Sequence, residues 1–297
     1  MGQGFSGTPG GSVGSGGSGV PGSDWSDGRL LRAVLLQEAT PAELSPRERV
    51  ERVCERVAAL GDADLVLLPE LWATGFFAFD DYARTAQPLD GPVVAALGEA
   101  ARAAGVHLHA GSVVERAPDG RLHNTSLLLT PDGELAHTYR KVHLFGYGAR
   151  ESELLAPGDG VGAHAAPFGR VALSTCYDLR FPELFRAQVD DGAELLLVTS
   201  AWPAARVAHW RLLTRARALE NQCFLLAVNA AGTQHGTELA GRSVLVDPWG
   251  EVLAEAGSEP GELRVAFAPS AVAAARAEFP ALADRRLFPG EESGGAR

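Results

Sequence analysis

The feature that most constrains the fold is an alternation of short apolar runs with segments of helical periodicity, which the chain repeats in its second half. The apolar run 30–37 reads as a buried strand, and the apolar residues of 45–60 recur at helical spacing. Ser45 followed by Pro46 suits a helix start, and Gly61 suits the helix end. Strands that alternate with helices indicate a layered α/β domain with mixed sheets.

The same reasoning assigns elements along the whole chain. Strands are predicted at 30–37, 64–68, 106–114, 122–129, 135–140, 171–175, 195–199, 224–229, 243–246 and 252–254, and helices at 45–60, 92–104, 182–190 and 209–221. No linker interrupts 29–288, so we expect one domain there. The Gly/Ser-rich stretch 1–28 predicts a disordered tail, and 289–297 a short C-terminal tail.

Composition excludes several classes of function. With 37 acidic and 26 basic residues the formal charge is −11, which argues against general nucleic-acid binding. Three cysteines without a CxxC pair argue against a disulfide framework or a zinc ribbon, and favour a reducing cytoplasm. We find no export signal and no apolar run long enough to cross a bilayer, so no membrane association is expected. No metal or cofactor is predicted.

Three reactive side chains directly follow strand-like runs: Glu70, Lys141 and Cys176. In open α/β sheets, ligand sites gather outside the carboxyl ends of strands, so the three could converge. A carboxylate, an amine and a thiol supply the base, the cation and the nucleophile that acyl transfer requires. Each residue alone also has a plainer interpretation, as a buried small hydrophobe or a surface charge.

The segments around these residues form ordered motifs. They are LLPE at 67–70 leading to Gly75-Phe76, YRKVHLF at 139–145 and CYDLRFPE at 176–183, with support from SAWP at 200–203, RALENQ at 217–222, GRS at 241–243 and DPWG at 247–250. Together they closely resemble the nitrilase, or carbon-nitrogen hydrolase, superfamily over about 30–288.

The resemblance implies a four-layer α-β-β-α sandwich and a Glu-Lys-Cys triad, here Glu70, Lys141 and Cys176. It also implies a second glutamate near the substrate. Glu151 matches that place in the segment ESELLAPGD at 151–159, with Glu153 as the alternative. Family members commonly form dimers or larger assemblies, so a homodimer or larger homo-oligomer is expected.

Four further residues are interpreted around this triad. The backbone N–H of Tyr177 is a candidate oxyanion donor beside Lys141. Arg180 either binds a substrate carboxylate or anchors Asp178 or Glu183 structurally, and both interpretations stay open. Trp202 is a candidate pocket wall, and His143 is expected to support the site's loop through hydrogen bonds.

The CYDLRFPE form of the nucleophile motif is most similar to the branch with omega-amidases and deaminated-glutathione amidases. The predicted function is therefore hydrolysis of a small, carboxylate-bearing amide through a cysteine thioester, with release of ammonia. Alternatives are carbamoyl-amine or nitrile hydrolysis, a catalytically inactive binding protein on the same fold, and a redox-sensing cysteine protein. The remaining cysteines, Cys54 and Cys223, are interpreted as core packing. His107 and His109 share one strand face, a spacing that permits metal binding, but without further ligands ordinary packing or surface placement is favoured.

Overall fold

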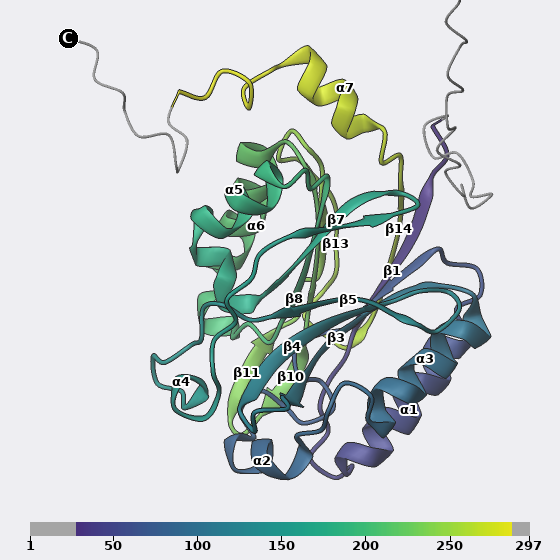
Figure 1. Cartoon of the computed structure of the whole chain (residues 1–297), viewed down its shortest axis with the longest axis vertical. Helices are drawn as coiled ribbons and strands as arrows, with labels where there is room; N and C mark the ends of the chain where they lie inside the picture. The colour runs from purple at the N-terminus through teal and green to yellow at the C-terminus, as the bar shows by residue number, and fades with distance from the viewer. Residues whose placement is uncertain (1–27, 287–297) are drawn as a thin grey trace, which may run out of the picture.

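Two six-stranded sheets pack face to face in the computed structural model, which describes residues 28–286 (Figure 1). The tails predicted at 1–28 and 289–297 lie outside the described residues, apart from Gly28. Within 28–286 there is no helix with the length and apolar character needed to cross a membrane.

The first sheet has the strand order β14-β1-β2-β3-β4-β5. Its strands are β1 (Leu31–Gln37), β2 (Leu65–Leu67), β3 (His107–Arg116), β4 (Leu122–Leu129), β5 (Leu135–Arg140) and β14 (Gly261–Phe267). Strands β1, β2 and β3 run parallel, and the other pairings are antiparallel.

The second sheet follows the same plan, with the order β13-β12-β9-β8-β7-β6. Its strands are β6 (Ala163–Ala166), β7 (Gly169–Thr175), β8 (Leu195–Ser200), β9 (Phe224–Asn229), β12 (Val244–Val246) and β13 (Val252–Glu255). Here β7, β8 and β9 are the parallel strands. A small two-stranded sheet, β10 (Ala231–Gln234) with β11 (Thr237–Ala240), lies apart from both.

Helices cover the outer face of each sheet. In Figure 1, α1 (Pro46–Ala58) and α3 (Pro92–Ala104) lie against the first sheet, and α5 (Pro182–Asp190) and α6 (Val207–Asn221) lie against the second. The shorter helices are α2 (Tyr82–Thr85), α4 (Glu151–Leu154) and α7 (Ala271–Glu278), with 3₁₀ turns η2 (Phe79–Asp81), η3 (Cys176–Arg180) and η4 (Ala204–Arg206). The predicted α-β-β-α order is confirmed.

Alternation along the central strands explains why their sequences read as unbroken apolar runs. On β1, Leu35 packs into the core between the sheets, while Leu36 packs under α1 and α3. On and just after β2, Leu67 and Leu68 divide between the same two cores. Because successive side chains point to opposite faces and both faces are covered, most positions in these strands are apolar; the exceptions on β1 are Arg32, which is exposed, and Gln37.

The structure corrects some predicted boundaries. Ser45 does cap α1, since its side chain accepts from the Glu48 N–H while Glu48 accepts from the Ser45 N–H. The helix ends at Ala58 rather than at Gly61, and α6 begins at Val207 rather than at 209. We did not predict β6, β10, β11, β14 or α7. The alternation of Leu263, Val265 and Phe267 in β14 carried a strand signal that was missed.

Candidate active site

Glu70 lies just beyond the end of β2, where the chain turns sharply. Leu71 takes a left-handed backbone conformation with φ of 45°, which non-glycine residues rarely adopt. The neighbouring strand β3 passes so close that a Cβ on Gly111 would lie 2.0 Å from the Pro69 carbonyl oxygen. Only glycine, which has no Cβ, fits at position 111 without a clash, and its φ of 66° also favours glycine. Gly111 therefore allows the end of β2 to approach β3 closely, which positions the Glu70 carboxylate.

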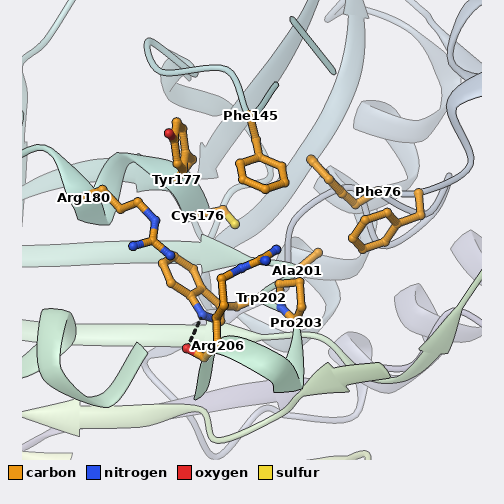
Figure 2. Close-up of a pocket in the computed structure, with 10 residues that line it drawn as sticks. Phe76, Phe145, Cys176, Tyr177, Arg180, Ala201, Trp202, Pro203 and Arg206 are labelled. Carbon is orange, nitrogen blue, oxygen red and sulfur yellow. Dashed lines mark hydrogen bonds between the residues drawn. The ribbon is translucent and has the colours of Figure 1, made fainter. Parts of the chain in front are cut away.

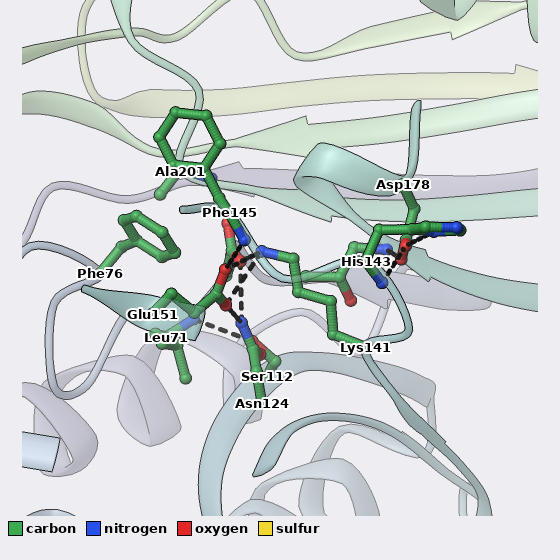
Figure 3. A network of polar contacts seen from close by, with 12 residues as sticks. Leu71, Phe76, Ser112, Asn124, Lys141, His143, Phe145, Glu151, Asp178 and Ala201 are labelled. Carbon is green, nitrogen blue, oxygen red and sulfur yellow. Dashed lines mark hydrogen bonds and ion pairs between the residues drawn. The ribbon is translucent and has the colours of Figure 1, made fainter. Parts of the chain in front are cut away.

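A fully buried network joins Glu70 to Lys141 and Glu151 (Figure 3). Lys141 Nζ donates to Glu70 Oε1 at 2.8 Å and contacts Glu151 Oε1 and Oε2 at 3.0 and 2.9 Å. Glu70 Oε2 accepts from the backbone N–H of Ala201 at 3.0 Å, and Glu151 Oε2 accepts from that of Phe145 at 2.7 Å. The strand-end pattern predicted that Glu70 and Lys141 converge, and the family resemblance implied Glu151; the structure brings the three together.

Asn124 on β4 belongs to this network and was missed from the sequence. Its Nδ2 donates to Glu70 Oε1 at 2.8 Å and to Glu151 Oε1 at 2.9 Å, so it bridges the two carboxylates. The available signal was the run of polar residues 123–126 in the predicted strand 122–129, which directly precedes the lysine strand. Buried polar side chains need partners, so such a residue indicates a network at that depth.

The two glutamates proposed for the fourth position lie in different environments. Glu151 is fully buried at the start of α4. Glu153 is 69% exposed and lies 3.7 Å from Arg150. The residue that reaches the network is therefore Glu151.

Electrostatics keep Lys141 charged although no water reaches it. Burial alone lowers the pKa of Lys141, but the charges of Glu151 and Glu70 outweigh burial, and the net pKa is raised above its ordinary value. Burial raises the pKa of Glu151, and the Lys141 charge opposes that rise. One cation thus holds two buried carboxylates in a single unit.

Cys176 lies at the end of β7, as the first residue of η3, and it has φ of 48°. This strained conformation turns its thiol out of the strand direction. Burial raises the pKa of the Cys176 thiol, the Glu70 charge raises it further, and the Lys141 charge opposes them. The thiol is consequently protonated at neutral pH, and a base must accept its proton during attack.

Asp178 connects the cysteine turn to the lysine segment. Its carboxylate accepts from the Thr175 N–H at 2.9 Å, from Tyr139 Oη at 2.8 Å and from the His143 N–H at 3.2 Å. His143 Nδ1 also lies 2.8 Å from Asp178 Oδ1, so His143 supports the loop by hydrogen bonding, as expected. Because Tyr139 and His143 both lie two residues from Lys141, Asp178 fixes the amine relative to the thiol.

A pocket with about 310 Å³ of empty space opens beside Cys176 (Figure 2). Its walls are mainly aromatic, formed by Phe76, Phe77, Phe145, Tyr177 and Trp202. Two arginines, Arg180 and Arg206, also line it, and none of the carboxylates in residues 28–286 does. Buried Lys141 lies behind this lining, with Nζ 5.2 Å from the centre of the Phe76 ring.

The remaining predicted residues occupy this pocket as well. The indole of Trp202 is buried, its backbone N–H donates to Asn229 Oδ1 at 2.7 Å, and the guanidinium of Arg180 lies 4.9 Å above the ring. Arg180 also lies 3.2 Å from His209 Nδ1. Within 28–286 it makes no ion pair with Asp178 or Glu183, so the structural-anchor interpretation of Arg180 is wrong.

The plainer interpretations of the other cysteines and histidines are confirmed. Cys223 packs in the core between the sheets, and Cys54 packs against the core under α1. His109 is buried with Nε2 2.7 Å from Ser126 Oγ. Across the described part of the chain, no three His, Cys, Asp or Glu side chains gather in a way that could hold a metal ion.

Comparison with known proteins assigns the family. A model of the family described as carbon-nitrogen hydrolase matches residues 37–277. The chain belongs to this family. It is 39% identical over 268 residues to the 2-oxoglutaramate amidase of Paenarthrobacter nicotinovorans, which covers 88% of this chain and 91% of that one. Vertebrate omega-amidases are also among its relatives.

Solved structures agree with this family assignment. The hydrolase superposes with a TM-score of 0.81 and 33% identity on XC1258 from Xanthomonas campestris, a CN-hydrolase superfamily protein with an arsenic adduct in its active site, covering 88% of this chain and 98% of that one. A mutant amidase from Nesterenkonia sp. AN1, carrying the acetamide moiety of fluoroacetamide on its active-site cysteine, superposes with a TM-score of 0.75 and 29% identity over 87% and 95%. The predicted superfamily, fold and amide-hydrolysing activity are thereby confirmed.

Proposed function

We propose that this hydrolase cleaves small carboxylate-bearing amides through a thioester on Cys176, with Glu70 as the base and Lys141 as an oxyanion donor. The observation that carries the proposal is a protonated thiol in a cationic, aromatic pocket, beside a buried carboxylate-amine network. A nucleophile, a base and a fixed positive charge are the parts that acyl transfer requires.

In the first step, Cys176 Sγ attacks the amide carbon while Glu70 accepts the thiol proton. The amide oxygen gains negative charge, which Lys141 and the backbone N–H of Tyr177 stabilise. In this scheme one Lys141 proton is bound by Glu70 Oε1 and a second is shared by the two Glu151 oxygens, which leaves the third for the oxyanion. Donors already in place stabilise this charge without reorganisation.

In the second step, Glu70 returns the proton to the leaving nitrogen, the C–N bond breaks and ammonia departs, leaving the thioester. Water then attacks the thioester while Glu70 accepts one of its protons. Collapse releases the carboxylic acid, and the proton on Glu70 returns to the thiolate. A single base used twice leaves the enzyme unchanged.

Glu151 acts by position and charge in this scheme. It shares Lys141 with Glu70, and it holds the backbone N–H of Phe145, whose ring forms one wall of the pocket. It therefore orients the lysine and the pocket wall together. Trp202 forms the opposite apolar wall and carries Arg180 on its face.

The carboxylate preference of the substrate rests on Arg180. Its guanidinium is held over Trp202 and near Tyr177, with no acidic partner among the described residues. A planar guanidinium can bind a carboxylate with two parallel hydrogen bonds. The name of the related 2-oxoglutaramate amidase, whose substrate bears both an amide and a carboxylate, supports this assignment.

A substrate panel tests the proposal. Ammonia release is expected from 2-oxoglutaramate and succinamate, with little turnover of nitriles and N-carbamoyl amino acids of similar size. Rapid quenching should add the mass of the acyl group to the peptide that contains Cys176. Turnover of the N-carbamoyl compounds with none of the amides would reject the proposed substrate class.

We also propose a cytoplasmic homodimer or larger homo-oligomer. Nucleophilic chemistry at Cys176 needs a reducing compartment that keeps the thiol free. An exposed apolar surface on and beside α6, the α6 patch, supports assembly and consists of Leu212, Leu219, Trp249 and Phe279. Light scattering should show that the wild type is a multimer and that the double variant Leu212→Glu, Leu219→Glu is a monomer. A wild-type monomer at micromolar concentration would reject the proposed assembly.

A further inference from the structure

The pocket contains a second guanidinium, that of Arg206, for which neither the sequence nor the proposed mechanism gives a role. Arg206 ends η4, directly after the Trp202-Pro203 segment, and its side chain is half-buried. Its backbone oxygen accepts from Trp202 Nε1 at 2.8 Å, which ties η4 to the pocket wall. The position of the Arg206 backbone is therefore set by a residue that already lines the site.

The charge of Arg206 has no acidic partner among the described residues. Its one recorded side-chain contact is with the ring of Phe145, whose centre lies 5.5 Å from the guanidinium carbon. Most other arginines of this acidic protein form ion pairs, such as Arg140 with Glu115 and Arg211 with Glu255. An unpaired, half-buried cation in a reactive pocket indicates that its partner is a ligand.

Arg180 and Arg206 differ in how firmly they are held. Arg180 lies on Trp202, near Tyr177 and within hydrogen-bonding distance of His209. Arg206 has only the face of Phe145, and a charge-assisted hydrogen bond to a carboxylate is stronger than such a contact. In the view of Figure 2, the two guanidinium groups flank the sulfur of Cys176.

We propose that Arg206 is a second carboxylate-binding residue. Its guanidinium moves off the Phe145 ring and binds the acid end of the substrate together with Arg180. This inference rests on the proposed function and deepens it, because it adds Arg206 to Arg180 in selecting monoamides of short dicarboxylic acids over neutral amides. The backbone N–H of Phe145 donates to Glu151 Oε2, so the pocket wall stays in place when the guanidinium moves.

The kinetic test compares two amides of equal shape. Succinamate carries a carboxylate where 4-methylpentanamide carries an isopropyl group. Arg206→Met should lower kcat/KM for succinamate about 10- to 100-fold, mainly through KM, because a hydrogen bond to a charged group is lost. The same variant should change kcat/KM for 4-methylpentanamide less than about threefold, and Arg206→Lys should restore part of the loss.

A matched control is Arg47→Met. Arg47 is 88% exposed on α1, where it pairs with Glu51, so this variant removes the same side chain far from the pocket lining. Kinetics for both amides should equal those of the wild type. Equal losses on both amides in Arg206→Met would overturn the inference, since they would show a role in pocket shape alone.

A binding test separates this inference from the proposed function. Calorimetry with succinate on Cys176→Ala needs no turnover, and a further Arg206→Met substitution should weaken binding about 10-fold or more. Unchanged affinity, or no binding of succinate to Cys176→Ala, overturns the role of Arg206. If instead the wild type hydrolyses no amide while succinate binding still depends on Arg206, the proposed function fails and the carboxylate site stands.

Discussion

The two halves of the chain build sheets on one plan but contribute different chemistry. Each places three parallel strands joined by helices, β1-β2-β3 and β7-β8-β9, beside antiparallel strands. The first half supplies the charged network of Glu70, Lys141 and Glu151. The second supplies the thiol of Cys176 and most of the pocket wall.

The halves meet at equivalent strand ends. Glu70 lies just beyond β2, and Ser200 ends β8. The backbone N–H of Glu70 donates to the Ser200 carbonyl oxygen, with 3.4 Å between N and O, and the Ala201 N–H donates to Glu70 Oε2. The base is thus oriented by backbone of the half that carries the nucleophile. Because neither half contains a complete site, the interface between the two sheets is part of the active site.

The largest expected effect comes from removing the thiol of the second half. Cys176→Ala should lower amide turnover about 10⁴-fold or more, because no other group in the pocket can form the thioester. Ammonia release measures this loss, and circular dichroism should show an unchanged fold. Cys54→Ala, in α1, is the matched control and should keep full activity.

Removing the base from the first half should cost less. Glu70→Gln keeps the shape but accepts no proton, so kcat should fall about 10²- to 10⁴-fold. Steady-state ammonia release measures this change. Glu153→Gln at the surface should have no effect, and a Glu70→Gln enzyme with wild-type kcat would contradict the assignment of the base.

Leucines at matching positions test whether the two sheets contribute equally to the shared core. Leu67 on β2 and Leu197 on β8 are fully buried in the core between the sheets. Each leucine-to-alanine change should lower the free energy of unfolding by about 2–5 kcal/mol. Urea titration measures both, and a loss confined to one half would show that the sheets are not equivalent in packing.

Gly111 has a role in the first half that depends on a close backbone contact. Gly111→Ala would place its Cβ 2.0 Å from the Pro69 carbonyl oxygen and should displace Glu70, lowering kcat/KM about 10²-fold. Gly120→Ala is the control, because Gly120 also has a positive φ, 84°, but has no atom within 4 Å of the added Cβ. Equal kinetics for the two variants would contradict the steric argument.

The effect that is smallest at neutral pH concerns acid stability and a buried histidine of the first sheet, His109. Burial lowers the pKa of His109 to about 3, so the folded state resists a proton that the unfolded chain binds below its ordinary pKa near 6.5. The free energy of unfolding should therefore fall as pH drops from about 6.5 towards 3, by at most about 1.4 kcal/mol per pH unit from this group. Urea titrations at several pH values should show that the free energy of unfolding of His109→Gln falls less steeply with decreasing pH than that of the wild type. The variant of an exposed histidine, His235→Gln, should match the wild type.

Much of the fold could be predicted because its signals are local. Continuous apolar runs at 195–199 and 224–229 become doubly covered central strands, and the Ser45-Glu48 capping box starts α1 where expected. Strand β14 was missed although its alternation is local, but its place in the sheet depends on a distant partner. Strand β14 is defined by pairing with β1, more than two hundred residues earlier in the chain.

The site divides in the same way. Glu70, Lys141, Cys176 and Glu151 could be predicted from sequence motifs, because these reactive residues follow predicted strands or lie in segments that resemble the family. Asn124 and Arg206 were missed: the only local mark of Asn124 is a polar side chain in a predicted strand, and an arginine in a short turn has none. Their importance lies in what they face: two buried carboxylates for Asn124, and the pocket for Arg206.

By itself, the sequence determined the layered α/β architecture, the family and the side chains available for chemistry, because periodicity and motif spacing are properties of neighbouring residues. Only the tertiary structure decided which carboxylates share Lys141, which arginines lack a partner, and how the thiol is kept protonated. Those outcomes depend on distance and desolvation between segments far apart in the chain, and both exist only once the two sheets have packed.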